Sequence, residues 1–508
     1  MQPLTIYWSR RDLRLADNPA LLAASAHAIS TKTLFLPLFI LEDYMTAGDP
    51  TFQFGYPSRW FLSQALPQFA SQFEQFAVVT GKGAQYLIDL NKKYNLTIFV
   101  NDDVYVDFYK QITKLENAGV TITVCEDALS VPKETRTGEG NLYSVFTPFK
   151  KNVWARFIAH KPQATFKSVH ELQYLSKKAV NELSGLLPNT AEGIFNVFSK
   201  KRLLHVGGST LDLSELIPEQ KITGWYTSEA EALKRFSDYL KSGDLDAYEK
   251  NRNSLELDAA NVDEERIAYT GRTSKMSLAL AWGLVSARTL MHMMQKQFDE
   301  AFDNPFSTRV SEGALTYISE LIWREFYRYQ LFHRPDLMDT EFQKKFQGTI
   351  AWVDKKIAHE RFVAWIKGET GYPIVDAAMK QVAEIGWMHN RSRMIVASIL
   401  TKNFGVNWRW GMEYFRAVLI DLDEASNSGG WQWGASVGAD PKPIRIFNAE
   451  LQAKNYDASG AYQNRWLNPD NTFMLSSKPV PIIEHKLARE EAIKRYSLGA
   501  TKAPNNKR

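Results

Sequence analysis

The sequence predicts an α/β fold: an N-terminal domain with a doubly wound parallel sheet, then a long connector, then an all-helical domain. Over residues 1–130, short and nearly continuous apolar runs alternate with helix-length stretches. This alternation is typical of parallel strands that helices cover on both faces. The alternation stops over residues 131–215, where Pro, Lys, Gly and Asn recur. From residue 216 to 490, long amphipathic stretches replace the strand-like runs, which favours helices.

The elements of the N-terminal domain follow in chain order. The expected strands are Leu4–Trp8, Thr33–Leu41, Phe76–Thr80, Thr97–Val100 and Val120–Val124. The expected helices between them are Pro19–Ala28, Pro57–Phe76, Ala84–Tyr94 and Tyr105–Ala118. Repeated strand–helix–strand units imply a parallel sheet, and such sheets bind ligands at the carboxyl ends of their strands.

In the second half, the clearest helical patterns are Glu229–Lys241, Ala279–Lys296, Gly313–Phe332 and Pro373–Ile385. Residues 491–508 are expected to form a basic, frayed tail, since residues 494–508 carry no acidic side chain.

Composition excludes several classes of protein. The 508 residues carry 61 Lys and Arg against 57 Asp and Glu, a net charge of +4 that by itself does not indicate a nucleic-acid partner. The single cysteine, Cys125, rules out an intrachain disulfide or an iron–sulfur cluster and suits the reducing cytoplasm. No apolar run is long enough to cross a membrane, and no spacing resembles a metal site. The 14 tryptophans either fill a core or take part in chemistry.

Two basic or hydroxyl-rich motifs each allow two interpretations. The segment Trp8–Arg14 ends the first strand with three arginines, which either bind an anion or pair with Asp12 and Asp17 to fix the turn. Residues Thr273–Ser277 place hydroxyls at the start of a helix. There they form a phosphate cradle or simply cap the helix.

Two helical motifs carry side chains suited to a flat polar ligand such as a base. Glu320, Trp323 and Arg324 share one helix face, which is either a ligand face or an ion pair beside a core indole. Asn390 and Met394 are four residues apart. An asparagine can hydrogen-bond a base edge, and a methionine can pack on a ring, although both also occur beside an ordinary core.

The densest group of polar residues is Asp421–Trp433. Two acids alternate, an amide follows, and a Gly-Gly turn at residues 429–430 is expected to present Trp431 and Trp433. Glycines allow a backbone to approach a ligand closely, although an ordinary surface loop is the simpler interpretation.

These motifs, in this order, resemble the photolyase/cryptochrome family. The resemblance rests on Trp8–Arg14, on residues 17–21, 273–277, 320–328, 371–377 and 387–394, and on residues 419–448 with Gly429-Gly430-Trp431-Gln432-Trp433. It implies an α/β domain, a connector and a helical domain that binds FAD. The residues it assigns to the cofactor are Tyr248, Thr273, Ser274, Lys275, Met276, Ser277, Tyr317, Arg393, Asp421, Leu422, Asp423 and Asn427. Asn427 would face flavin N5, and Arg393 would pair with Asp421.

Within the family, the resemblance is to class I cyclobutane pyrimidine dimer photolyases, with Asn390 where (6-4) photolyases carry a histidine. It implies that UV-damaged DNA is the partner. The residues it assigns to the lesion and its DNA are Arg252, Glu320, Trp323, Asn390, Arg391, Met394 and Trp433. Glu320 would act catalytically as a protonated donor to the dimer carbonyls, provided that burial keeps it protonated, with Asn427 as the second catalytic residue.

The resemblance also implies an electron path from the surface to the flavin through Trp352, Trp408 and Trp431. A cryptochrome light receptor with the same pocket is the alternative function. The antenna chromophore stays open among a folate, a deazaflavin and none, because Asp107-Phe108 stand where folate-binding members tend to show Asn-Glu. We expect a cytoplasmic monomer without a membrane partner.

Overall fold

The structure, a computed structural model, describes residues 1–46, 54–104, 106–199, 201–259, 267, 271–298, 310–439, 444–468 and 480–502. Its first part contains a five-stranded parallel sheet in the order β3-β2-β1-β4-β5. The strands are β1 (Gln2–Ser9), β2 (Leu34–Glu42), β3 (Ala77–Gly81), β4 (Tyr94–Asn101) and β5 (Thr121–Cys125). All five predicted strands are confirmed; most side chains of β1–β4 are buried, whereas the edge strand β5 is half-buried to exposed.

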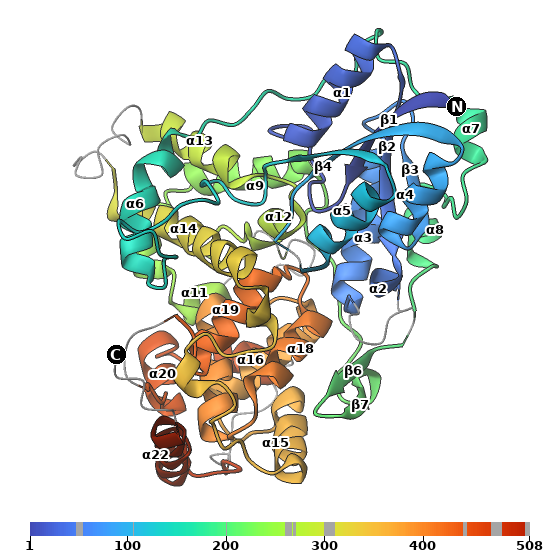
Figure 1. The fold of residues 1–508 in the computed structure, drawn as a ribbon. Helices are drawn as coiled ribbons and strands as arrows, with labels where there is room; N and C mark the ends of the chain where they lie inside the picture. The colour runs from blue at the N-terminus through green and yellow to red at the C-terminus, as the bar shows by residue number, and fades with distance from the viewer. Residues whose placement is uncertain are drawn as a thin grey trace.

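Helices cover this sheet on both sides (Figure 1). They are α1 (Pro19–Thr31), α2 (Asp43–Thr46), α3 (Tyr56–Ala70), α4 (Gly83–Asn91) and α5 (Val106–Asn117). The predicted start of the last helix, Tyr105, lies outside the described residues. Asn18 caps α1 by accepting from the Leu21 amide, so the residues after β1 both end the strand and begin the helix.

The segment expected as a connector contains short elements of its own. They are α6 (Phe146–Ala159), α7 (Lys177–Asn181), α8 (Ala191–Phe195) and an antiparallel hairpin of β6 (Leu203–Val206) and β7 (Ser209–Asp212). Helix α6 buries Phe149, Val153 and Phe157, and Phe149 lies 5.3 Å from the Phe326 ring, centroid to centroid. The segment is therefore partly built into the helical half.

The helical half confirms the predicted class. Its helices are α9 (Glu229–Lys241), α10 (Tyr248–Asn251), α11 (Leu255–Ala259), α12 (Ser277–Trp282), α13 (Ala287–Phe298), α14 (Glu312–His333), α15 (Lys355–Lys367), α16 (Pro373–Ile385), α17 (Asn390–Ser398), α18 (Trp408–Val418), α19 (Glu424–Gly434), α20 (Ala449–Tyr456), α21 (Ala461–Leu467) and α22 (His485–Lys502). A π-helical turn, η6 (Ile399–Asn403), extends α17. None of the described helices is long and apolar enough to span a bilayer.

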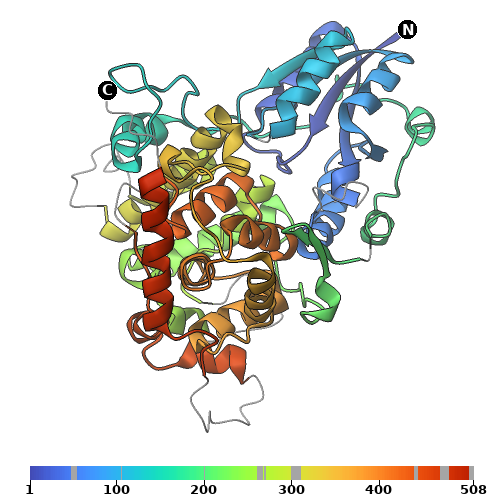
Figure 2. The ribbon, with the colours of Figure 1, turned by 60° about the horizontal axis from the view of Figure 1, so that its bottom comes forward.

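Two helical predictions need correction. The single helix predicted over 279–296 is two helices, because Gly283 adopts φ 67° and ends α12. A Cβ on Gly283 would lie 2.0 Å from the Arg11 carbonyl oxygen, so the break allows the N-terminal half to pack closely. The tail predicted from residue 491 is helical as far as Lys502, since α22 packs along the helical half (Figure 2), and Tyr496 donates to the Ala435 carbonyl at 2.6 Å.

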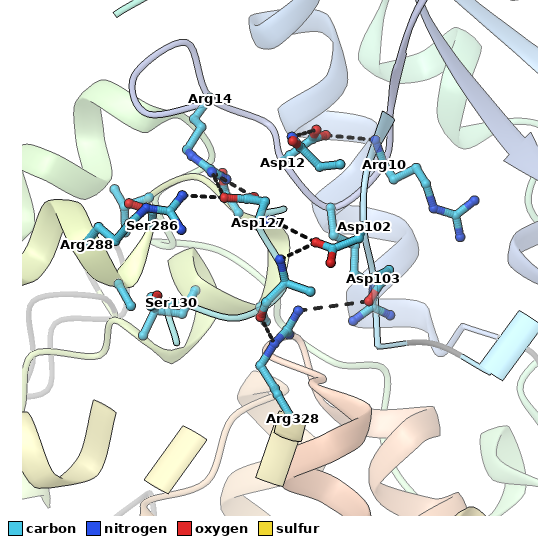
Figure 3. A pocket seen from close by; sticks show the side chains of 18 of the residues that line it. Arg10, Asp12, Arg14, Asp102, Asp103, Asp127, Ser130, Ser286, Arg288 and Arg328 are labelled. Carbon is cyan, nitrogen blue, oxygen red and sulfur yellow. Dashed lines mark hydrogen bonds and ion pairs between the residues drawn. The ribbon is translucent and has the colours of Figure 1, made fainter. Parts of the chain in front are cut away.

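A buried ion-pair network joins the carboxyl edge of the sheet to the helical half (Figure 3). Arg14 donates to Asp127 at 2.7 Å, and Arg288 donates to both Asp127 and Asp17. Arg328 donates to the Ala128 carbonyl at 2.7 Å. The side chains of the three arginines in Trp8–Arg14 meet protein partners, but these are Glu42, the Leu422 carbonyl and Asp127 rather than the predicted carboxylates of Asp12 and Asp17.

This network predicts how stability depends on pH. Burial alone would raise the pKa of Asp127, but Arg14 and Arg288 outweigh it and lower the pKa from 3.8 to about 2. Asp127→Asn should lower the free energy of unfolding by about 3 kcal/mol near neutral pH, since it leaves buried guanidiniums without their shared carboxylate.

The Asp127 contribution is present above the unfolded pKa and is lost as pH falls through the folded pKa. The gap between the wild type and the variant, measured by urea unfolding, should narrow by about 2 kcal/mol between about pH 4 and pH 2. Asp107→Asn, which removes an exposed partner of Lys110, is the matched control. A gap that stays constant with pH would contradict the prediction.

Candidate functional site

A cavity of about 520 Å³ opens in the helical half among α10, α12, α14, α17, α18 and α19. It is lined by every residue that the sequence predicts for cofactor or lesion contacts. Of the predicted site residues, only Trp352 and Trp408 lie away from it. Its volume suits a bound organic cofactor with its substrate.

Burial divides the lining residues into two groups. Seven of the twelve predicted cofactor residues are buried and form a floor, on which Asp421, Leu422 and Ser274 are at most 6% exposed, whereas Ser277 of this set is exposed. None of the predicted lesion residues is buried, and Asn390 and Trp433 lie at the mouth. The buried floor of the cavity thus belongs to the cofactor set, and the lesion set lies nearer the solvent.

The floor contains an ion pair between Arg393 and Asp421. The guanidinium donates to both carboxylate oxygens, at 3.0 and 2.8 Å, and also to the Met388 carbonyl. Asp421 is 4% exposed, so its charge depends on this partner. The pair matches the one that the resemblance implies.

One wall consists of residues Thr273–Ser277, immediately before and at the start of α12. Ser274 Oγ lies 2.9 Å from the Tyr317 hydroxyl. Thr273 Oγ1 is buried and has no hydrogen-bond partner among the residues that the structure describes. Hydroxyls and backbone amides are thus available to an oxygen-rich ligand on this wall.

Lys275 is placed differently from what its motif suggests. Its backbone has φ 54°, and its ammonium is directed to Asp258 at 3.2 Å and lies 3.8 Å from the centre of the Trp387 ring. Gln381 also donates to Asp258, at 3.0 Å. The Lys275 charge is therefore already neutralised behind the wall, and its contribution to the cavity is mainly backbone.

His389 belongs to the same buried group, and a lone histidine in the sequence does not predict this placement. Burial lowers the pKa of His389 to about 4, so the ring is neutral near pH 7. Its Nδ1 accepts from the Arg391 amide at 3.1 Å and caps α17. His389 is thus a structural acceptor that orients the helix carrying Asn390 and Arg391.

The predicted Gly-Gly turn is wrong, because Gly429 and Gly430 lie within α19. Asp423 caps this helix by accepting from the Ser426 amide at 2.8 Å. A Cβ on Gly429 would lie 2.1 Å from the Tyr327 ring, so the glycine lets α19 pack closely on α14. The helix then carries Asn427, Trp431 and Trp433 into or beside the cavity.

Asn427 supplies an unpaired acceptor at the floor. Its Nδ2 donates to the Met412 carbonyl at 3.1 Å, which fixes the amide, while its Oδ1 is buried and meets no hydrogen-bond donor from the described part of the chain. A buried acceptor without a partner beside a cavity fits a ligand that brings an N–H donor.

At the mouth, Glu320 and Arg252 form an ion pair. Both side chains are about one-third exposed, at 33% and 31%. The carboxylate that the resemblance assigns as a donor to the dimer therefore lies beside a cation and is partly exposed to solvent. Arg391 donates to Asn253 at 2.7 Å and lies over the Tyr456 ring, which holds its guanidinium beside the same opening.

The three predicted electron-path tryptophans lead away from the cavity. Trp431 lines the floor, and its ring packs on Gly411 of α18. The contact is so close that a Cβ added to Gly411 would lie 2.0 Å from the indole ring. Trp408 is three residues before Gly411 on α18, so the two share a helix face. Val353, next to Trp352, donates to the Gly405 carbonyl at 3.0 Å, just before α18.

The ring contacts also reveal a neighbour that the sequence missed. Trp365 lies 6.0 Å from Trp431, centroid to centroid, and is fully buried. Spacing along the chain gives no indication of this contact, because α15 and α19 are far apart in sequence.

The carboxyl edge of the sheet is nearly filled. The cavity there is about 40 Å³ and is lined by the ion pairs of Figure 3. Nearby, Arg10 lies 5.0 Å from the Trp8 ring and bonds Glu42 at 3.1 Å. A folate or deazaflavin at this edge would require these side chains to move. Among the described residues, no cluster of His, Cys, Asp or Glu is arranged to hold a metal ion.

Comparisons with known proteins agree with this site. A family described as the FAD binding domain of DNA photolyase matches residues 317–474, and a family described as DNA photolyase matches residues 5–167. A deoxyribodipyrimidine photo-lyase from Synechococcus sp. is 31% identical, over 96% of this chain and 95% of that protein. Another from Agrobacterium fabrum is 30% identical, over 97% of each chain.

Solved structures agree as well. A class III photolyase from Agrobacterium tumefaciens has a TM-score of 0.73 at 28% identity, covering 99% of this chain and 98% of its own. A cryptochrome from Synechocystis sp. shares the fold, with a TM-score of 0.75 at 24% identity, covering 97% of this chain and 99% of its own.

Proposed function

The chain belongs to the DNA photolyase family, and from this premise we propose that its cavity binds FAD at the floor and a cyclobutane pyrimidine dimer at the mouth, and repairs the dimer in light. One observation carries the proposal: two sets of residues suited to two different ligands line one cavity at two depths. The narrower resemblance to class I members stays a prediction.

We assign the floor to the cofactor. The hydroxyls of Thr273, Ser274 and Ser277, with neighbouring backbone amides, would hold the phosphates. The Arg393–Asp421 pair would lie beside the flavin ring. Tyr248 and Tyr317 face the same wall, with ring centroids 5.1 Å apart, while Met276, Leu422 and Asp423 complete the lining.

When bound, fully reduced FAD supplies the light-driven chemistry: one electron passes to the dimer and returns after the ring splits, so no net redox change occurs. The chain's own residues position the cofactor and keep water away from the reacting groups. Asn427, fixed through Met412, would accept a hydrogen bond from the flavin through Oδ1. As a neutral amide, it adds no charge there. The buried floor keeps water away from the reacting groups.

We assign the mouth to the lesion. Photolyases are among the enzymes that extrude their target nucleotide from the duplex, and a damaged base is easier to unstack. Trp433 and the open side of Trp323 would pack on the dimer, with Met394 beside them. Asn390 would hydrogen-bond to the thymine edges.

The Arg252–Glu320 pair changes the role that the sequence suggests for Glu320. Its carboxyl oxygens would accept hydrogen bonds from the N–H groups of the thymine rings, with the Arg252 guanidinium beside it as a donor. Arg252 and Arg391, which line the same cavity, would then lie beside the extruded nucleotide and its phosphates.

We further propose that Trp352, Trp408 and Trp431 carry electrons to the oxidised cofactor. The packing of Trp431 on Gly411 and of residue 353 on Gly405 supports this order from floor to surface. The domain bounds, the monomeric state and the cytoplasmic location remain predictions from the sequence, and the antenna stays open.

The central test of function is repair itself. Chemically reduced, FAD-loaded protein mixed with thymine-dimer DNA should restore the ultraviolet absorbance of intact thymine under blue light and leave it unchanged in the dark. No recovery in light would overturn the repair function and favour a light receptor.

A second prediction concerns the floor ion pair. Asp421→Asn should weaken FAD binding roughly 30-fold, because removing one partner of a buried charge pair costs about 2 kcal/mol or more. Flavin fluorescence titration measures the affinity. Asp336→Asn, which removes an exposed arginine partner outside the cavity, is the control and should bind FAD as the wild type does. If D421N binds FAD with unchanged affinity, the Arg393–Asp421 pair is not part of the cofactor site.

A third prediction concerns the tryptophans. Trp352→Phe should abolish light-driven reduction of oxidised FAD in the purified protein, since phenylalanine is far harder to oxidise, yet leave repair by chemically reduced protein intact. Photoreduction is measured by the loss of the flavin's blue absorbance, and repair is measured by the recovery of thymine absorbance. Trp60→Phe, in α3, serves as the control. Loss of both photoreduction and repair in W352F would contradict the proposed electron path.

A further inference from the structure

Helix α6 reaches the mouth of the cavity although it belongs to the segment expected as a connector. Phe146, its first residue, stacks on Trp323 with ring centroids 3.6 Å apart and planes 6° apart. Trp323 lines the cavity, so one face of its ring is covered by α6 and only the rest is available to a ligand. Helix α6 therefore forms part of the wall around the opening.

A cation on α6 lies at the same opening. Lys150, one turn after Phe146, donates to Ser319 Oγ at 2.6 Å, directly beside Glu320 in the chain. Burial lowers the pKa of Lys150, and Glu320 partly offsets this effect. The side chain is half-buried and can extend towards an anion at the mouth.

The outer face of α6 is basic and has no counter-charge. Its inner side chains Phe149, Val153 and Phe157 are buried, while Lys151 and Arg156 are exposed. Neither forms an ion pair with any described residue, in contrast to Lys110 and Lys234, which pair within their own helices. From residue 140 to 170 the chain contains no acidic residue.

We propose that α6 is one wall of the DNA interface: Lys151 and Arg156 bind backbone phosphates beside the lesion, and Lys150 and Phe146 border the opening. This inference rests on the proposed function and adds a surface that the motifs do not include. A basic helix next to a cavity that receives a nucleotide lies where the flanking strand must pass.

The test is DNA binding by the FAD-loaded protein, with Lys151→Gln combined with Arg156→Gln. Two lost phosphate contacts should lower affinity by about tenfold and reduce the slope of log K against log salt by about 1.8. Because phosphate contacts carry no base information, dimer-containing and undamaged duplexes should lose affinity by the same factor.

The matched control is Lys177→Gln combined with Lys178→Gln. These exposed lysines lie on α7, on the opposite side of the molecule from α6 in Figures 1 and 2, and their loss changes the net charge equally. The control should bind DNA as the wild type does. An equal loss in both variants would mean a net-charge effect and would overturn the inference, as would a wild-type slope in the α6 variant.

A failure of the proposed repair function would give a different experimental result from a failure of the α6 surface. If the wild-type protein binds dimer-containing and undamaged DNA equally, the lesion pocket is wrong whatever α6 does. If the wild type prefers dimer-containing DNA and the α6 variant keeps the wild-type affinity and salt dependence, the lesion pocket is supported and the proposed α6 surface is wrong.

Discussion

Arg328 on α14 is a side chain that links the two halves of the molecule to the cavity. It donates to the Ala128 carbonyl beyond the sheet edge and, at 2.8 Å, to Asp423 in the cavity lining. Burial alone would raise the pKa of Asp423, but Arg328 and Arg324 outweigh it and hold that pKa well below its usual range. Asp423 therefore stays ionised and caps α19, the helix that positions Asn427. The floor of the cavity is in this way set by a charge shared with the α/β half.

The same arrangement explains why the cavity has a rigid floor and an adaptable mouth. Floor side chains are held by buried partners, such as Arg393 on Asp421 and Met412 on Asn427. Mouth side chains are held by half-exposed contacts, such as Arg252 with Glu320. A permanently held cofactor needs pre-organised contacts, whereas DNA must enter and leave, and partly hydrated ion pairs rearrange at little cost.

The sequence predicts the architecture well because it depends on local patterns. Continuous apolar runs identify all five strands, and the motif order identifies the cavity lining. What the sequence cannot reveal depends on contacts between distant segments. Gly429-Gly430 resembles a turn, yet Gly429 is required by the approach of Tyr327. The break at Gly283 follows from the packing of Arg11. Two further contacts cannot be predicted from the local sequence: Lys275 pairs with Asp258, and Phe146 stacks on Trp323.

The interdomain ion pairs also have a consequence for how the chain is made. Asp17 and Asp127 leave the ribosome long before Arg288, their common partner, exists. Until then, Asp127 has only Arg14 of the two arginines that it binds in the folded protein, so the network cannot be completed within the α/β half alone. Once Arg288 and Arg328 are synthesised, the same charges become buried, and docking of the two halves becomes a late step of folding.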